Sequence, residues 1–208
     1  MRSYNCFTRW FAKVIILLFG CIGMSVSYAG VQSNPATLLT YIADNMVTQL
    51  RNNKATLKTK PEIVYNIAYK YVVPYADLPE MSKRVLPPKV WNNATASQRV
   101  EFQREFTRLV IRTYASALTS YQDQEIKIYP ARASAGNSVE IRSVITSSNS
   151  SPISVTYRLL KSGGNWKLYD MSVEGVSLIS SFRSQFADIL ARGNMQDLLK
   201  KMSQHNAG

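Results

Sequence analysis

The spacing of apolar residues changes from helical to strand-like and back along the chain, and this change restricts the fold most. Over about residues 96 to 120, apolar side chains recur every three or four positions, as on one face of an α-helix. Beyond residue 124 the period becomes two, and a tight turn at Ser162–Asn165 separates two of the alternating runs. Short links between these runs predict an antiparallel meander with one apolar face, formed by strands at 125–129, 139–145, 153–159 and 166–173.

Helices are expected on both sides of these strands. Residues 34–35, 59–62 and 95–98 carry helix-start signals, the first an Asn before a Pro and the others capping boxes. After the strands, residues 176–191 place apolar side chains on one face, and residues 192–194 indicate a helix stop and a new start. The predicted fold class is therefore α+β: a four-stranded antiparallel twisted sheet packed against a set of helices, with an apolar cleft between the layers.

The first 29 residues have the features of a secretory signal peptide. Basic residues precede an apolar segment, Val14–Gly23, which is too short to span a bilayer comfortably. Ser27–Ala29 is a small-x-small cleavage site, so we expect a mature single domain covering residues 30–208. A signal anchor is one alternative. A lipoprotein is another, because Leu18–Cys21 resembles a lipid-attachment box, although Phe19 is bulky for its position there.

Cleavage changes both the charge and the cysteine content. It removes three basic residues and no acidic ones, which lowers the Lys+Arg count from 25 to 22 against 13 acids and the net charge from +12 to +9. Cys6 and Cys21 are also lost, so the mature chain has no disulfide, thiolate nucleophile or cysteine metal site. Export argues against nucleic acid as a partner, and a membrane surface suits the basic charge better.

The sequence offers few groups for catalysis. Its one histidine, His205, stands near the end of the chain, and its nine glycines form no phosphate-binding run. Asp170 and Glu174 could act as paired carboxylates of a small hydrolase, because spacing of four places both on one face of a strand. The simpler interpretation is that they pair with Arg183 or Arg158. We therefore expect no enzyme activity, metal or cofactor.

Two stretches of the sequence carry a family resemblance. The first stretch consists of Met81–Leu86, Trp91 and Gln98–Tyr114, and the second of Pro152–Leu159, Trp166–Asp170, Glu174–Leu178 and Phe182–Phe186. In order and spacing these stretches closely resemble the MlaC, or toluene-tolerance, family of periplasmic phospholipid-binding proteins, over roughly residues 38 to 202. Phe182 stands where the family usually has Tyr, and Pro87 where it often has Gly.

The resemblance implies a periplasmic carrier that takes the acyl chains of a glycerophospholipid into the cleft. Such a carrier shuttles lipid between the inner and outer membranes and maintains the lipid asymmetry of the outer membrane. The resemblance also implies two docking partners, an inner-membrane lipid ABC transporter with a ring-forming lipid-binding subunit and an outer-membrane lipoprotein–porin complex. The alternative is an exported adaptor with a filled core and no lipid, because periodicity does not distinguish a packed core from a lipid-filled void.

The expected lipid-binding residues are those on the apolar faces that sheet and helices turn toward each other. Arg183, between two phenylalanines, is expected to pair with Asp170 or Glu174, because an unpaired buried guanidinium is costly. A role in holding the lipid phosphate is the alternative. The predicted lipid-binding set is Val85, Phe106, Val110, Tyr114, Ile141, Ile145, Val155, Tyr157, Leu159, Leu168, Val173, Leu178, Phe182 and Phe186.

Overall fold

The structure is a computed structural model that describes residues 28–131, 136–148 and 150–207. The segment predicted as a signal peptide, residues 1–29, lies outside the described residues except at its last two positions. Cleavage after Ala29 and the state of Cys21 therefore stay predictions.

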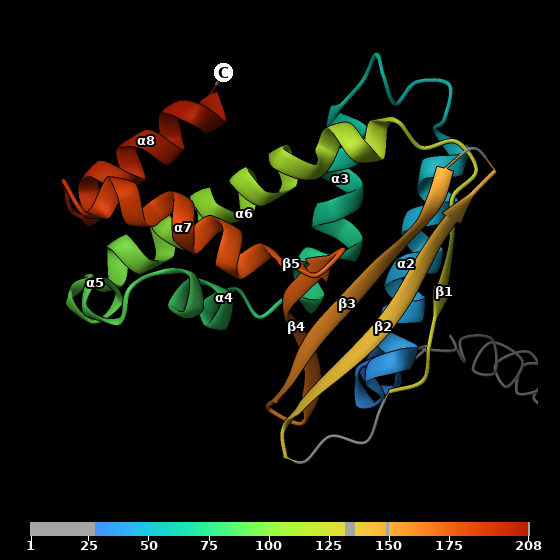
Figure 1. Cartoon of the computed structure of the whole chain (residues 1–208), viewed down its shortest axis with the longest axis horizontal. Helices are drawn as coiled ribbons and strands as arrows, with labels where there is room; N and C mark the ends of the chain where they lie inside the picture. Colours follow the sequence, from blue (N-terminus) through green and yellow to red (C-terminus); the bar gives the residue numbers. More distant parts are fainter. Residues whose placement is uncertain (1–27, 132–135, 149, 208) are drawn as a thin grey trace, which may run out of the picture.

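The chain passes from helices to an antiparallel sheet and back to helices (Figure 1). The helices are α2 (Pro35–Asn52), α3 (Glu62–Tyr71), α4 (Leu78–Val85), α5 (Pro88–Asn93), α6 (Ala96–Thr119), α7 (Leu178–Leu190) and α8 (Met195–Ala207), with short 3-10 segments η2 (Tyr28–Ser33) and η3 (Val73–Tyr75). The strands are β1 (Glu125–Ile128), β2 (Ser138–Ser147), β3 (Ser150–Ser162), β4 (Asn165–Val173) and β5 (Val176–Ser177).

Two of the three expected helix starts form as predicted. The side chain of Asn34 accepts hydrogen bonds from the first turn of α2, and Pro35 occupies its first position. Thr95 and Gln98 form a reciprocal capping box at the start of α6. The capping box expected from Thr59 is wrong. Helix α3 begins after Pro61, and the Thr59 hydroxyl donates instead to the carbonyl of Thr56, at 3.1 Å.

The four predicted strands are confirmed, but the predicted strand count is wrong. Within the described residues the sheet has five strands in the order β1-β2-β3-β4-β5, with every neighbouring pair antiparallel. The additional strand, β5, pairs Val176 with Val173 and is only two residues long, which is too short to show an alternating pattern. Between β3 and β4, Gly163 and Gly164 have φ of 58° and 85°, as the expected two-residue hairpin requires.

The buried apolar side chains of the described residues form three clusters, not one. The helical cluster joins α4, α6, α7 and α8, and four of its phenylalanines pack ring against ring with centroids 5.3 to 6.1 Å apart. The sheet cluster joins α2 to the strands and consists of Leu38, Leu39, Ile42, Val139, Ile141 and Leu159. The α3 cluster joins α2, α3 and α6 and consists of Leu50, Leu57, Val64, Ile67, Ala115 and Tyr121.

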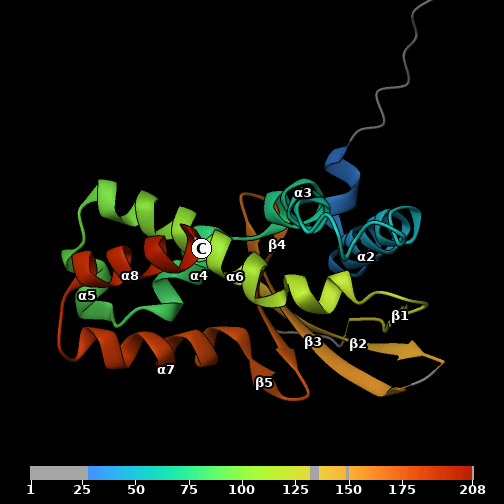
Figure 2. The same cartoon turned by 90° about the horizontal axis from the view of Figure 1, so that it is seen from above.

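These clusters reflect a layered arrangement. Figure 2 shows α2, α3 and the C-terminal half of α6 over one side of the sheet, with α7 leaving the edge of the sheet at β5. The remaining helices extend away from the sheet and pack on one another. The fold therefore has a sheet layer under α2 and a helical lobe beside it, and β4 and the start of α7 connect the two.

Candidate functional site

The apolar face of the sheet is covered at one end and open at the other. Ile141 and Leu159 are fully buried beneath α2, and Val155, further along β3, is still only 4% exposed. Beyond it, Ile153 is 38% exposed and Val176 is 65% exposed. The strand register places all of these side chains on one face, because Val155 lies opposite Ser143 and Val173, and Val173 opposite Val176.

The helical lobe provides the opposing wall. Val110 and Tyr114, one turn apart on α6, are half-buried and pack against the helical cluster. Met171 on β4 also packs against the helical cluster, whereas its cross-strand partner Tyr157 packs against the sheet cluster. The two clusters therefore meet along the middle of the apolar face, and we call this boundary the seam.

Two tyrosines place polar groups along this apolar boundary. Burial raises the pKa of Tyr157, against the opposing effect of a 3.4 Å hydrogen bond from the hydroxyl of Ser143, which is 1% exposed. Burial also raises the pKa of Tyr114, and the negative charge of Asp170 raises it further. Both phenols therefore stay neutral near pH 7. Each can donate one hydrogen bond while its ring remains part of an apolar wall.

The structure divides the predicted lipid-binding residues into three groups. Seven belong to or pack against the helical cluster: Val85, Phe106, Val110, Tyr114, Leu178, Phe182 and Phe186. Four belong to or pack against the sheet cluster: Ile141, Tyr157, Leu159 and Leu168. Ile145, Val155 and Val173 lie on the same apolar face, next to its open end, and belong to neither cluster. Lipid contact at each of these residues stays a prediction.

Residues that sequence reasoning missed also line the seam. Met171 was omitted because the predicted strand was not assigned faces, although it stands two residues from Val173 and so shares its face. The face assignment is complicated by a register shift between Arg158 and Leu159, which places Leu168, and not Tyr169, opposite Leu159. Ser143 alternates with the apolar residues of β2, but its bond to Tyr157 depends on the strand register, which the sequence alone does not give.

Asp170 joins the sheet to α7. Its carboxylate, on a residue 5% exposed, accepts hydrogen bonds from Arg158 Nη1 at 2.9 Å, Ser177 Oγ at 2.7 Å and the backbone N–H of Ile179 at 3.1 Å. The last bond places a negative charge at the N-terminus of α7, where the helix dipole favours it. Arg158 also pairs with Glu140 at 2.7 Å. The expected pairing of Asp170 with Arg158 is confirmed, and the contacts of Asp170 connect β4 to the start of α7.

The predicted position of Glu174 is wrong. Strand β4 ends at Val173, and Glu174 follows in a turn with φ of 49°, so it does not share a strand face with Asp170. Its carboxylate accepts the backbone N–H of Ser154. The two carboxylates therefore have separate partners, and the structure does not present them as the catalytic pair of a hydrolase.

The predicted carboxylate partner of Arg183 is also wrong. Its guanidinium is exposed and donates from Nε, at 3.0 Å, and from Nη2 to the backbone carbonyl of Arg84. That carbonyl belongs to the last turn of α4, where helix carbonyls lack partners within the helix. Because the guanidinium is not buried, it needs no counter-charge. Arg183 instead ties α7 to the end of α4.

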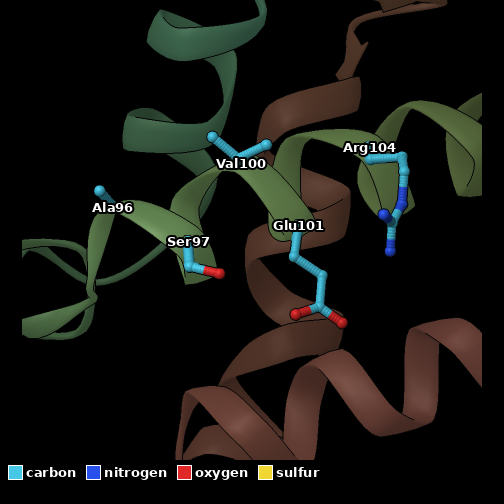
Figure 3. Close-up of a pocket in the computed structure, with 5 residues that line it drawn as sticks. All are labelled: Ala96, Ser97, Val100, Glu101 and Arg104. Atoms are coloured by element: carbon cyan, nitrogen blue, oxygen red, sulfur yellow. The ribbon is translucent and has the colours of Figure 1, made fainter.

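Two further hollows lie on outer surfaces. Figure 3 shows the first, along α6, where Ala96, Ser97, Val100, Glu101 and Arg104 line an open depression. Tyr65, Tyr69, Arg108, Arg112 and Asn206 line the second, between α3, α6 and α8. Within the described ranges, His, Cys, Asp and Glu residues form no group that could hold a metal ion. None of the helices described is both long enough and apolar enough to cross a membrane.

Comparison with known proteins places this arrangement in one family. The MlaC protein family model matches residues 41–204. Toluene tolerance protein ttg2D of Pseudomonas putida is 32% identical over 155 residues, which cover 74% of this chain and 72% of that protein. The intermembrane phospholipid transport system binding protein MlaC of Haemophilus influenzae is 27% identical over 200 residues, 94% of this chain and 92% of that protein.

A solved structure agrees with these sequence matches. The phospholipid-binding protein of Ralstonia solanacearum, determined in complex with a phospholipid, is 27% identical and aligns with a TM-score of 0.77 over 84% of this chain and 97% of that one. The family match extends from α2 into α8 and so includes both walls of the seam. A match of this extent, supported by relatives in sequence and in structure, shows that the chain belongs to the MlaC family.

Proposed function

We propose that this protein is a periplasmic phospholipid carrier that holds the acyl chains of a glycerophospholipid at the seam. The observation that carries this proposal is the apolar sheet face, buried at one end and open at the other, in a chain that aligns over 84% of its length with a relative solved in complex with a phospholipid. A relative in Haemophilus influenzae is named for intermembrane phospholipid transport, which supports transport as the purpose of binding.

The division of the core suits such a ligand. Among the described residues, no element contributes fully buried side chains to both the helical cluster and the sheet cluster. Parting the two clusters at the seam therefore separates partly buried side chains such as Met171 and Tyr157, while each cluster keeps its own packing. Acyl chains that enter there gain about 0.8 kcal/mol for each buried methylene, which a carrier needs in order to compete with a bilayer.

We further propose that the protein shuttles lipid between the inner and outer membranes and thereby maintains outer-membrane asymmetry. Its partners would be an inner-membrane lipid ABC transporter with a ring-forming subunit and an outer-membrane lipoprotein–porin complex. Membership of the MlaC family supports these partners. The chain's net charge of +12, or +9 without the first 29 residues, suits approach to anionic membrane surfaces, which attract about 1 kcal/mol per nearby basic residue.

Organic extraction of the purified protein, followed by mass spectrometry, tests lipid binding. We expect phospholipid in near-equimolar amount, and much less in Val110→Trp and Val155→Trp, whose indole rings would occupy the seam. Val100→Trp is the matched control, because Val100 also lies on α6 but is 67% exposed on an outer surface. Absence of lipid from gently purified wild-type protein would favour the exported adaptor. Unchanged lipid in both seam variants, with native melting, would remove these residues from the site.

A further inference from the structure

The hollow between α3, α6 and α8 contains several polar groups whose hydrogen-bonding capacity is unused. Tyr65 and Tyr69 lie one turn apart on α3, and Arg108 and Arg112 lie one turn apart on α6. Asn206 on α8 completes the lining. We call this set the arginine–tyrosine hollow. Within the part of the chain that the structure describes, the side chains of Tyr65, Tyr69 and Arg112 have no hydrogen-bond or ion-pair partner.

A buried carboxylate, that of Glu105, contacts two residues of this hollow. Glu105, 2% exposed, accepts hydrogen bonds from Asn206 Nδ2 at 2.9 Å and Arg104 Nε at 3.0 Å, and pairs with Arg108 at 3.4 Å. Burial alone would raise the pKa of Glu105, but these partners together hold it below its ordinary value. The carboxylate thus remains charged near pH 7. Its bond to Nδ2, with a second bond from Nδ2 to the Glu105 carbonyl at 3.0 Å, fixes the orientation of the Asn206 amide.

That orientation leaves one buried acceptor unsatisfied. Asn206 Oδ1 is buried and has no hydrogen-bond partner in the structure. With less than 1 Å² of accessible surface, this oxygen is out of reach of a docked ligand. The groups that the hollow offers to a ligand are therefore the two guanidinium groups and the two phenols.

We propose that the arginine–tyrosine hollow docks an acidic segment of a partner protein. Side-chain carboxylates spaced along one segment would receive the guanidinium hydrogen bonds from α6 and the phenol hydrogen bonds from α3 at the same time. A single phosphate group presents its acceptors at one point, whereas these four donor side chains lie on two helices. Tyr69 is 43% exposed and the Arg108 side chain 53%, so a partner can reach both.

This site is separate from the lipid seam. Arg108 and Arg112 each stand two residues from Val110, which places them about 200° around α6, on the side away from the seam. Docking at the hollow would therefore leave the open end of the apolar face free. The inference goes beyond the proposed function and does not require it, since the hollow is built from residues that line no part of the seam.

Amide NMR with a short capped peptide of alternating Glu and Gly tests the proposal, because it detects weak binding and reports the Asn206 side-chain amide directly. We expect saturable shifts at Tyr69, Arg108, Arg112 and Asn206, and none with a Gln–Gly peptide of the same length. Arg112→Gln should weaken binding about tenfold, the usual effect of losing one charge-assisted hydrogen bond.

Arg104→Gln is the matched control. Arg104 and Arg108 are similarly exposed and both contact Glu105, but Arg104 lies outside the hollow. The Arg104→Gln substitution should therefore change the affinity for the peptide by less than about twofold. Equal weakening in Arg104→Gln and Arg112→Gln, or shifts scattered over other basic residues, would overturn the proposal in favour of general charge attraction. Absence of saturable shifts would overturn it outright.

Inorganic phosphate and phosphatidylglycerol vesicles test the competing ligand class. If either produces the same shifts with the same dependence on Arg112, the hollow binds anionic headgroups and the proposal is wrong. Lipid extraction from Arg112→Gln keeps the two proposals apart, and we expect wild-type phospholipid content. Absence of lipid from every variant, with peptide binding intact, would refute the carrier function but leave the docking site standing.

Discussion

Replacing Asp170 by asparagine tests whether one carboxylate holds the sheet and α7 together. The substitution preserves the shape of the side chain and keeps one acceptor oxygen. It removes the negative charge that faces Arg158, and it directs an amide N–H₂ toward one of three donors, which are Arg158 Nη1, Ser177 Oγ and the backbone N–H of Ile179.

The expected loss follows from these contacts. Breaking a buried ion pair by removing one partner costs about 3–5 kcal/mol. The Arg158 side chain is 34% exposed and keeps its bond to Glu140, so the lower end applies. We therefore expect Asp170→Asn to lower the free energy of unfolding by about 3 kcal/mol. In a domain of this size, that corresponds to a fall in Tm of about 6–12 °C.

Urea unfolding followed by circular dichroism measures this loss, with the m-value checking that the unfolding transition itself is unchanged. Asp188→Asn is the matched control, because Asp188 is exposed on α7 and its substitution should change stability by no more than about 0.5 kcal/mol. If Asp170→Asn differs from wild type by no more than this control, the contacts of Asp170 do not join sheet and helix energetically, and the reasoning is refuted.

Three other predictions concern separate regions. The mature protein should begin at Gly30 without an acyl group, and an intact mass showing lipid on Cys21 would contradict this. Arg183→Met should lower the free energy of unfolding by about 1–2 kcal/mol through the lost bonds at the end of α4, with bound lipid unchanged; reduced lipid at unchanged Tm would instead indicate a phosphate ligand. Although burial opposes it, the folded pKa of Glu105 lies below its ordinary value of 4.5, so its stabilisation is present above that value and is lost as pH falls through the folded pKa. Glu105→Gln should therefore show a weaker dependence of Tm on pH below about 4.5 than wild type.

Local sequence signals predicted most of the secondary structure because each depends on neighbouring residues only. Alternation identified the four longer strands, and Gly163–Gly164 identified the hairpin between two of them. Strand β5 could not be found in this way, since two residues show no period. The Thr59 capping box failed because the chain forms successive turns up to Lys60 and α3 begins only at Glu62, so Thr59 does not occupy the position that caps the helix.

The site was harder to predict because its contacts join distant parts of the chain. Arg183 seemed to need a carboxylate when only neighbouring residues were considered, yet its partner is the carbonyl of Arg84, 99 positions away. Glu105 and Asn206 are 101 positions apart and carry no shared pattern. Periodicity assigns an apolar face to each element, but it does not say which faces meet or where they part.

The contacts of Asp170 bear on how the proposed seam would open. Asp170 stands on β4, and two of its three donors belong to the start of α7, while the rest of α7 packs in the helical cluster. If the helical lobe moves away from the sheet, it must either break these two bonds or rotate about them as a hinge. Turning is favoured because breaking them removes two of the three hydrogen bonds of a buried carboxylate, which then keeps only Arg158. Under the carrier proposal, the seam would therefore widen at the end of β3 where Ile153 is already exposed, with the Asp170 junction kept closed.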